Sequence, residues 1–312
     1  MTSLHMLVVL VLVAGGVPGA GAQAMKRILE RNTPAHQAAL RFMRGVNVGN
    51  YLEYAPNHPA ANQTYSAQDF KLIRTEGFDH VRVPVAWHLY AGPAPAFTLT
   101  NSIFTKADAL VNTALDKGLG VILNLHQYYA FAADPSGERA KLNAIWRQVA
   151  EHYSNAPPTV AFELLNEPNG AATTAVMNQI YPEVIHQIRE TNPNRTLFLG
   201  PGQWNGIDEL KLGASAGLVL PDDDANLIVA VHCYDPYYFT HQGAEWALPD
   251  TATTGVIFPG PPPSPVRLDS SISHSWVLDW FRLYNTQPTA INPSSPYAFR
   301  SRMQHAREWS EY

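Results

Sequence analysis

Asn166, Glu167 and Pro168 form the segment of the sequence whose residue types are best suited to chemistry. They follow a largely apolar run from Phe162 to Leu165, which predicts a buried strand. Proline ends a strand because it has no N–H to continue the hydrogen-bond ladder. The sequence therefore predicts a carboxylate beside an amide at a strand end, where α/β barrels place groups for acid–base catalysis. A glutamate that only caps a helix is the alternative.

Other polar or aromatic side chains occur at or near the ends of predicted strands. They are Asn47, Asn50, Arg82, Trp87, His126, His232 and Tyr234. The carboxyl ends of parallel strands converge on one face of a barrel, so we expect these side chains to lie together. A lone buried histidine is more often a hydrogen-bonded core residue, but the combination favours a functional site. A buried Arg82 requires a carboxylate partner, and a catalytic carboxylate is a natural one.

Two other kinds of site are disfavoured. His126 and His232 have no second histidine at the spacing of a metal-ligand pair on a strand or helix. The run from Asp222 to Asp224 lacks the spacing of a calcium loop and is predicted to be a solvated turn. The nucleophile elbow of a serine hydrolase, Gly-x-Ser-x-Gly, does not occur.

The elements that position these residues alternate between strand and helix. Strands are predicted at 44–50, 78–85, 119–125, 159–165, 195–200 and 226–233, and helices at 66–76, 105–117, 142–153, 176–190 and 296–312. Strands that are apolar almost throughout are typical of a parallel sheet covered by helices. An open doubly wound sheet has the same pattern, although no Gly-rich phosphate loop follows the first strand. The proline-rich segment 258–265 is predicted to be a stiff loop within one domain.

The ordered set of segments resembles glycoside hydrolase family 5, the cellulase family of retaining glycosidases. The matching segments are Arg44–Asn50, Val81–Pro84, Val121–His126, Phe162–Pro168, His232–Tyr234 and Phe239–Trp246. Asn-Glu-Pro alone is a weak signal, whereas the whole set, from about Phe42 to the end of the chain, is specific. The resemblance implies an α/β fold of the (β/α)8 TIM-barrel type, with about six of the eight βα units present.

The resemblance also implies roles for individual residues. Glu167 would be the acid/base, protonated at the working pH, and Asn166 would bind the sugar 2-hydroxyl. Arg82 and Tyr234 would orient and polarise the nucleophile. The substrate would also contact His126, His232, Asn47, Trp87, Tyr128 and Trp204. No cofactor or metal is implied, and the expected partner is a β-linked polysaccharide or oligosaccharide rather than a nucleic acid.

A retaining glycosidase needs a second carboxylate, about 5–5.5 Å from the first, as nucleophile. In the family this is a glutamate at the end of strand seven, and no matching stretch occurs before Tyr312. We expect the nucleophile beyond Tyr312 and interpret the chain as truncated at its C-terminus. Six strands cannot close an eight-stranded barrel, so we expect these 312 residues alone to be inactive or insoluble.

Three functions follow from the resemblance. The first is a secreted endo-β-1,4-glucanase that acts with retention. The second is a β-mannanase or β-1,3-glucanase of the same family, since substrate choice depends on loops. The third is a catalytically inactive carbohydrate-binding pseudo-enzyme. The substrate panel that would separate the first two needs a Glu167→Gln control.

Composition and the N-terminal leader set the remaining expectations. The chain has 312 residues, 46% of them hydrophobic and 15% charged, and a net charge of -5, which indicates a large core and argues against a nucleic-acid surface. Residues 1–24, with the apolar stretch Met6–Ala14, are typical of a secretory signal peptide, although Met25 is an alternative start because no Lys or Arg precedes the stretch. We expect a secreted or periplasmic catalytic domain over 25–312, monomeric when complete. The single cysteine, Cys233, is expected to be buried in a strand.

Overall fold

The computed structural model describes residues 33–55, 57–210, 217–258 and 263–286. The predicted signal peptide and the predicted helix at 296–312 lie outside these residues. The chain divides into two compact units, Met1–His232 and Cys233–Tyr312, and each is described by itself. Among the helices of the described ranges, none is both long and apolar enough to cross a bilayer.

The first unit contains a six-stranded sheet in which every neighbouring pair is parallel. Its strands are β1 (Gly45–Asn47), β2 (His80–Val85), β3 (Gly120–Leu125), β4 (Val160–Glu163), β5 (Leu197–Leu199) and β6 (Leu227–Val229). They follow one another in chain order across the sheet, which confirms the prediction of a barrel-type α/β fold. All residues of β2, β3 and β4 are buried, and the polar side chains among them are His80, Arg82, Asn124 and Glu163.

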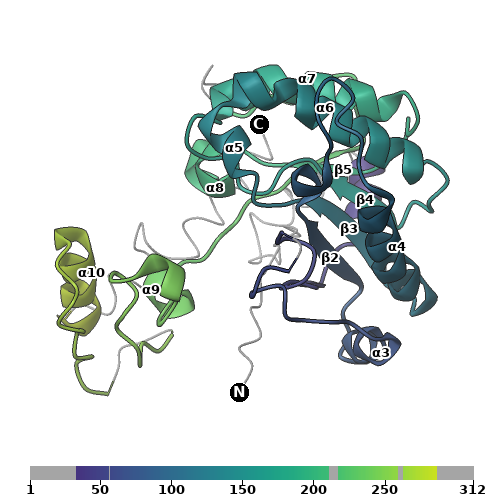
Figure 1. Cartoon of the computed structure of the whole chain (residues 1–312). Helices are drawn as coiled ribbons and strands as arrows, with labels where there is room; N and C mark the ends of the chain where they lie inside the picture. The colour runs from purple at the N-terminus through teal and green to yellow at the C-terminus, as the bar shows by residue number, and fades with distance from the viewer. Residues whose placement is uncertain (1–32, 56, 211–216, 259–262, 287–312) are drawn as a thin grey trace, which may run out of the picture. The chain divides into compact units, whose positions relative to one another are not determined.

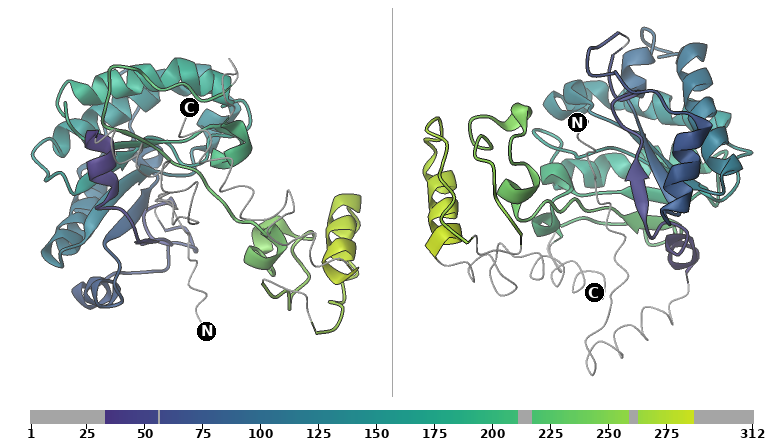
Figure 2. Two further views of the ribbon diagram at one scale, coloured as in Figure 1. Left: turned by 180° about the vertical axis from the view of Figure 1, so that it is seen from behind. Right: turned by 90° about the horizontal axis from the view of Figure 1, so that it is seen from below.

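Four long helices connect the first five strands, and all four were expected from the sequence. They are α3 (Ala67–Thr75), α4 (Asn101–Asp116), α6 (Pro135–His152) and α7 (Thr174–Arg189). Ser66 and Asp69 form a capping box at the start of α3. Helix α6 begins seven residues earlier than expected because Pro135 occupies its first turn and Asp134 caps it through the Gly137 N–H. Figure 1 shows α4, α6 and α7 against the sheet, and Figure 2 shows the same unit from behind and from below.

Along each strand, successive side chains point alternately to the inner and the outer face of the sheet. Ile122, Ala161 and Phe198 belong to one buried cluster, into which Phe42 inserts from the segment after α2 (Pro34–Ala39). Asn124 and Glu163 lie two residues further along β3 and β4, and they are direct register partners. The period of two therefore places polar side chains inside the sheet immediately above an apolar floor.

Short helical segments follow the strands at their carboxyl ends. They are η1 (Trp87–Tyr90), α5 (Tyr129–Ala133), α8 (Gly202–Asn205) and η2 (Ile207–Glu209). The segment α8 is a helix only in part, because Gln203, Trp204 and Asn205 all have positive φ, between 52° and 58°. Three consecutive non-glycine residues in the left-handed region are unusual and reverse the chain direction sharply.

The second unit has its own hydrophobic cluster, built around Val256, Val277 and Phe281. Its elements are α9 (Tyr237–Thr240), η3 (Glu245–Ala247) and α10 (Ser275–Thr286). Neither α10 nor a separate hydrophobic cluster around the proline-rich loop was expected from the sequence, and a single domain over 25–312 stays a prediction. The expected burial of Cys233 in a strand is wrong, because β6 ends at Val229 and Cys233 is partly exposed.

Candidate active site

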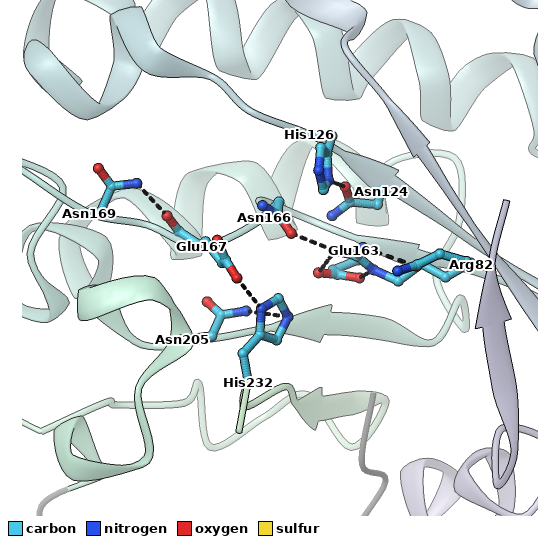
Figure 3. A network of polar contacts seen from close by, with 10 residues as sticks. Arg82, Asn124, His126, Glu163, Asn166, Glu167, Asn169, Asn205 and His232 are labelled. Carbon is cyan, nitrogen blue, oxygen red and sulfur yellow. Dashed lines mark hydrogen bonds and ion pairs between the residues drawn. The ribbon is translucent and has the colours of Figure 1, made fainter. Parts of the chain in front are cut away.

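Arg82 is at the centre of a buried polar network on the inner face of the sheet (Figure 3). Its side chain is 1% exposed and donates two hydrogen bonds to Glu163, of 2.5 Å to Oε2 and 2.7 Å to Oε1. It also donates to Oδ1 of Asn166 at 2.7 Å and to Oδ1 of Asn47 at 3.3 Å. A guanidinium that pairs with a carboxylate through two parallel bonds is held in one orientation. The three predicted residues Asn47, Arg82 and Asn166 are thus brought together.

Glu163, which was not among the residues predicted for the site, is the carboxylate partner of Arg82. We expected a catalytic carboxylate in this place, but the two bonds go to the strand residue and not to Glu167. The signal that could have found it is the period of two. Ala161 faces the inner cluster, and therefore Glu163 does as well.

Asn166 is buried and its amide orientation follows from its partner. A guanidinium has only donors, so the Asn166 atom that faces Arg82 must be the oxygen. The backbone N–H of Asn166 donates to the Leu125 carbonyl at 2.8 Å, which anchors the residue to β3. The arrangement leaves the NH2 group of Asn166 as the end of the amide that can donate to a ligand.

Glu167 lies next in the chain and turns away from the sheet. Its φ is +50°, which costs about 1–2 kcal/mol for a residue with a Cβ and marks a position where the fold imposes a conformation. The turn is fixed by Asn169, whose Nδ2 donates to the Glu167 carbonyl at 2.8 Å. The side chain of Glu167 is 19% exposed, and its Oε1 lies 2.6 Å from Nδ1 of His232, a residue that follows β6. Two predicted site residues that are distant in sequence therefore form a direct contact.

His126 lies beside this network at the end of β3. Its Nδ1 donates to Oδ1 of Asn124 at 2.8 Å. Burial, and then the positive charge of Arg82, hold the pKa of His126 well below its usual range, so the ring is neutral. A neutral imidazole beside Arg82 adds no second positive charge and keeps Nε2 as a hydrogen-bond acceptor.

The remaining predicted residues have different environments. Trp87 is fully buried and packs against Phe104 of α4, so the predicted sugar contact is not supported, because neither ring face reaches solvent. Trp204 is 55% exposed. The backbone N–H of Trp204 donates to the carbonyl of Pro168, the residue after Glu167, at 3.0 Å. Tyr234 belongs to the second unit, where its ring contacts that of His241 edge to face.

A small hollow opens beside Glu167 between the segments that follow β3 and β4. It is lined by Gln127, Tyr128, Phe131, Asn166, Glu167 and Asn169, among others. Tyr128 is largely buried there, stacks on His88 with a 4.3 Å ring separation and donates its hydroxyl to Glu138. Burial raises the pKa of this hydroxyl, so Tyr128 stays a neutral donor. Across the described ranges no group of three or more His, Cys, Asp or Glu side chains is arranged to hold a metal ion.

Comparison with known proteins places this geometry in a family. The family model for cellulase, glycosyl hydrolase family 5, matches residues 44–281. Endoglucanase H of Acetivibrio thermocellus is 32% identical over 200 residues, which are 64% of this chain, and the chain spans 21% of that relative's length.

Two solved structures of Cel5A from Thermotoga maritima resemble the chain closely. One, a mutant form in complex with cellobiose, is 34% identical with a TM-score of 0.64, covering 70% of this chain and 72% of that one. The other, in complex with mannotriose, is 34% identical with a TM-score of 0.63, covering 68% and 67%. The sheet, the Asn-Glu pair after β4 and the family match agree, and the chain belongs to glycosyl hydrolase family 5, the cellulase family.

Proposed function

We propose that the protein hydrolyses β-1,4-linked glucan as an endoglucanase, with retention of anomeric configuration. The observation that carries the proposal is the position of Glu167: a partly exposed carboxylate, held at positive φ after β4 and bonded to His232. The family match and the endoglucanase relative support the same reaction.

Glu167 acts as the general acid in this proposal. Its carboxyl proton passes to the glycosidic oxygen as the bond from that oxygen to the anomeric carbon breaks, and a second carboxylate forms the glycosyl–enzyme bond. Glu167, now ionised, then takes a proton from water, whose oxygen displaces the second carboxylate. The NH2 of Asn166 donates to the sugar 2-hydroxyl, which fits the orientation that Arg82 imposes on the amide. The location of the second carboxylate beyond Tyr312 stays a prediction.

Hydrolysis of β-mannan is the second candidate. A structural neighbour that is 34% identical binds mannotriose, while another form of the same protein binds cellobiose. Glucose and mannose differ at the 2-hydroxyl, the group that Asn166 is proposed to contact. Position 166 therefore contributes to the choice between the two substrates.

Export to the periplasm or the medium is part of the proposal. It is supported by the apolar stretch Met6–Ala14 and the small residues that follow it. The proposed partner is a polysaccharide or oligosaccharide with a β-linked backbone. Mass spectrometry of the protein recovered from the periplasm or medium would give the mature N-terminus, and an intact Met1 or Met25 there would contradict cleavage.

The experiment uses the protein expressed from the complete reading frame of the gene, beside the 312-residue chain. Release of reducing ends and loss of viscosity are followed on β-1,4-glucan, β-mannan and β-1,3-glucan. We expect glucan cleavage with a rapid fall in viscosity, and a loss of at least about 100-fold in Glu167→Gln, the size of a general acid–base contribution. Binding of oligosaccharide without any turnover would instead support the pseudo-enzyme.

A further inference from the structure

Asn205 is a buried amide in direct contact with the His232 ring, and neither the fold nor the proposed reaction has so far required it. The residue is fully buried and lies at φ +58° in the left-handed turn after β5. Its Nδ2 is 3.3 Å from Nε2 of His232, whereas Glu167 contacts the other ring nitrogen, Nδ1 (Figure 3). The three side chains form a chain of contacts from Asn205 through His232 to Glu167.

The surrounding backbone is shaped to hold this amide. The Asn205 carbonyl accepts the His232 N–H at 2.9 Å, so main chain and side chain both join the turn to His232. On the other side, Gly200 leaves room for the amide. A Cβ at position 200 would lie 2.4 Å from Cγ and Oδ1 of Asn205 and 2.7 Å from the Ala230 carbonyl oxygen. The same turn also supports the segment that carries Glu167, because the backbone N–H of Trp204 donates to the carbonyl of Pro168, the next residue.

Three hydrogen-bonding arrangements fit a histidine between an amide and a carboxyl group. In the first, the Asn205 NH2 donates to Nε2, so Nδ1 carries the ring proton and donates to Oε1 of Glu167. In the second, the amide is reversed, Nε2 carries the proton, and a protonated Glu167 donates to Nδ1. In the third, the amide is also reversed and both ring nitrogens carry protons, so Nδ1 donates to an ionised Glu167. The first leaves Oδ1 of Asn205 buried without a hydrogen-bond partner among the described residues, and the second and third would leave an NH2 group in that place. Buried carbonyl oxygens without partners are more common than buried N–H groups without partners.

We infer that Asn205 is a positioning residue that fixes His232 as the neutral tautomer with its proton on Nδ1. His232 then donates to Oε1 of Glu167, and the acid proton of Glu167 has to reside on Oε2. With the amide in this orientation, an N–H at Nε2 would face the NH2 of Asn205, a second donor. The inference deepens the proposed function and rests on it for its consequence: Oε2 is the oxygen that gives its proton to the leaving group.

The direct test is nuclear magnetic resonance of the protein labelled with 15N in its histidine side chains. The His232 signals are assigned as those that disappear in His232→Gln. We expect Nε2 to have the shift of an unprotonated ring nitrogen and Nδ1 that of a protonated one. In Asn205→Asp a carboxylate replaces the amide and both nitrogens become protonated. A wild-type spectrum with a protonated Nε2 would overturn the inference.

Activity provides the second readout. Asn205→Asp keeps the size of the side chain and a residue type tolerated at positive φ. We expect it to lower kcat on β-glucan about tenfold or more, with KM changed less than twofold, because it misdirects the general acid. Activity on an aryl glycoside whose leaving group needs no proton should fall far less. Gln203→Asn, at an exposed position of the same turn, is the control and should match the wild type.

The two proposals fail in different ways. If the protein does not cleave any glycan but His232 has the predicted tautomer, the proposed function is wrong and the geometry stands. If Glu167→Gln abolishes activity but Asn205→Asp behaves as the wild type on both substrates, the function stands and the positioning role is refuted. Asn205→Gly retains the backbone freedom of the turn and shows whether a loss in Asn205→Asp comes from the side chain or from the backbone.

Discussion

Substitution of Glu163 by glutamine tests the buried ion pair that organises the site. Arg82 is 1% exposed and Glu163 is 3% exposed, and two charge-assisted hydrogen bonds join them. Glutamine keeps one acceptor oxygen but sets an NH2 group against a guanidinium that has only donors. Removal of one partner from a buried pair costs about 3–5 kcal/mol because the other charge remains buried without compensation. We expect Glu163→Gln to lower the free energy of unfolding by that amount.

The assay is urea unfolding at neutral pH, followed by tryptophan fluorescence and far-ultraviolet circular dichroism. Glu183→Gln is the matched control, because Glu183 also pairs with an arginine, Arg139, but the two are 47% and 37% exposed. A pair of that kind contributes about 0–1 kcal/mol. The double variant Arg82→Met with Glu163→Gln should cost less than the two single changes added together. Equal effects of Glu163→Gln and Glu183→Gln, or a loss under 1 kcal/mol, would refute the role given to burial.

Three further changes have distinct expected outcomes. Burial, and then the charge of Lys141, lower the pKa of His88 from 6.5 to about 4. The stability that the neutral His88 side chain contributes to the folded state is therefore complete above pH 6.5, and it is lost as the pH falls toward 4. His88→Phe should therefore remove about 3 kcal/mol of acid-induced destabilisation, and an unchanged pH profile of unfolding would contradict this. Trp204→Ala should raise KM on glucan while unfolding stays within about 0.5 kcal/mol of the wild type, since the ring is 55% exposed; an unchanged KM would exclude a sugar contact. Arg195 donates to four backbone carbonyls, and Arg195→Met should cost about 3 kcal/mol or more in urea unfolding, against little change for the exposed Arg282→Met.

The sheet and its helices could be predicted because they depend on local patterns. Predicted apolar strands of six to eight residues alternate with amphipathic helices, and such a chain has few ways to form a parallel sheet. Signals at helix ends were equally direct, as at Ser66 and Asp69. The predicted start of α6 is seven residues too late because its first turn, capped by Asp134, is polar and carries no apolar stripe.

The site could be predicted only in part. Asn47, Arg82, Asn166, Glu167 and His232 are brought together because all lie at or near carboxyl ends of parallel strands. The sequence pattern does not show which of these site residues form hydrogen bonds with one another. Partner choice depends on the inner or outer face of each strand and on the turns that follow.

Trp87 shows the limit of predicting a contact from residue type and position. It follows β2 as a site residue would, yet the short helix η1 turns its ring toward Phe104 and the core. Asn205 shows the opposite limit. It lies in a left-handed turn, and the residue types of Gln203 and Trp204 do not predict that backbone conformation. Its contact with His232 also depends on Gly200, because a Cβ at that position would collide with the Asn205 side chain.

The most direct test of the account is the dependence of the Glu167→Ala reaction on the leaving group. In the protein from the complete reading frame, wild type and Glu167→Ala are compared on β-glucan and on an aryl β-cellobioside with a strongly acidic phenol. If Glu167 is the general acid, the variant loses at least about 100-fold on glucan but far less in cleavage of the activated aglycone, which needs no proton. Equal losses on both substrates, or full activity on glucan, would contradict the assignment of Glu167 as the residue that protonates the leaving group.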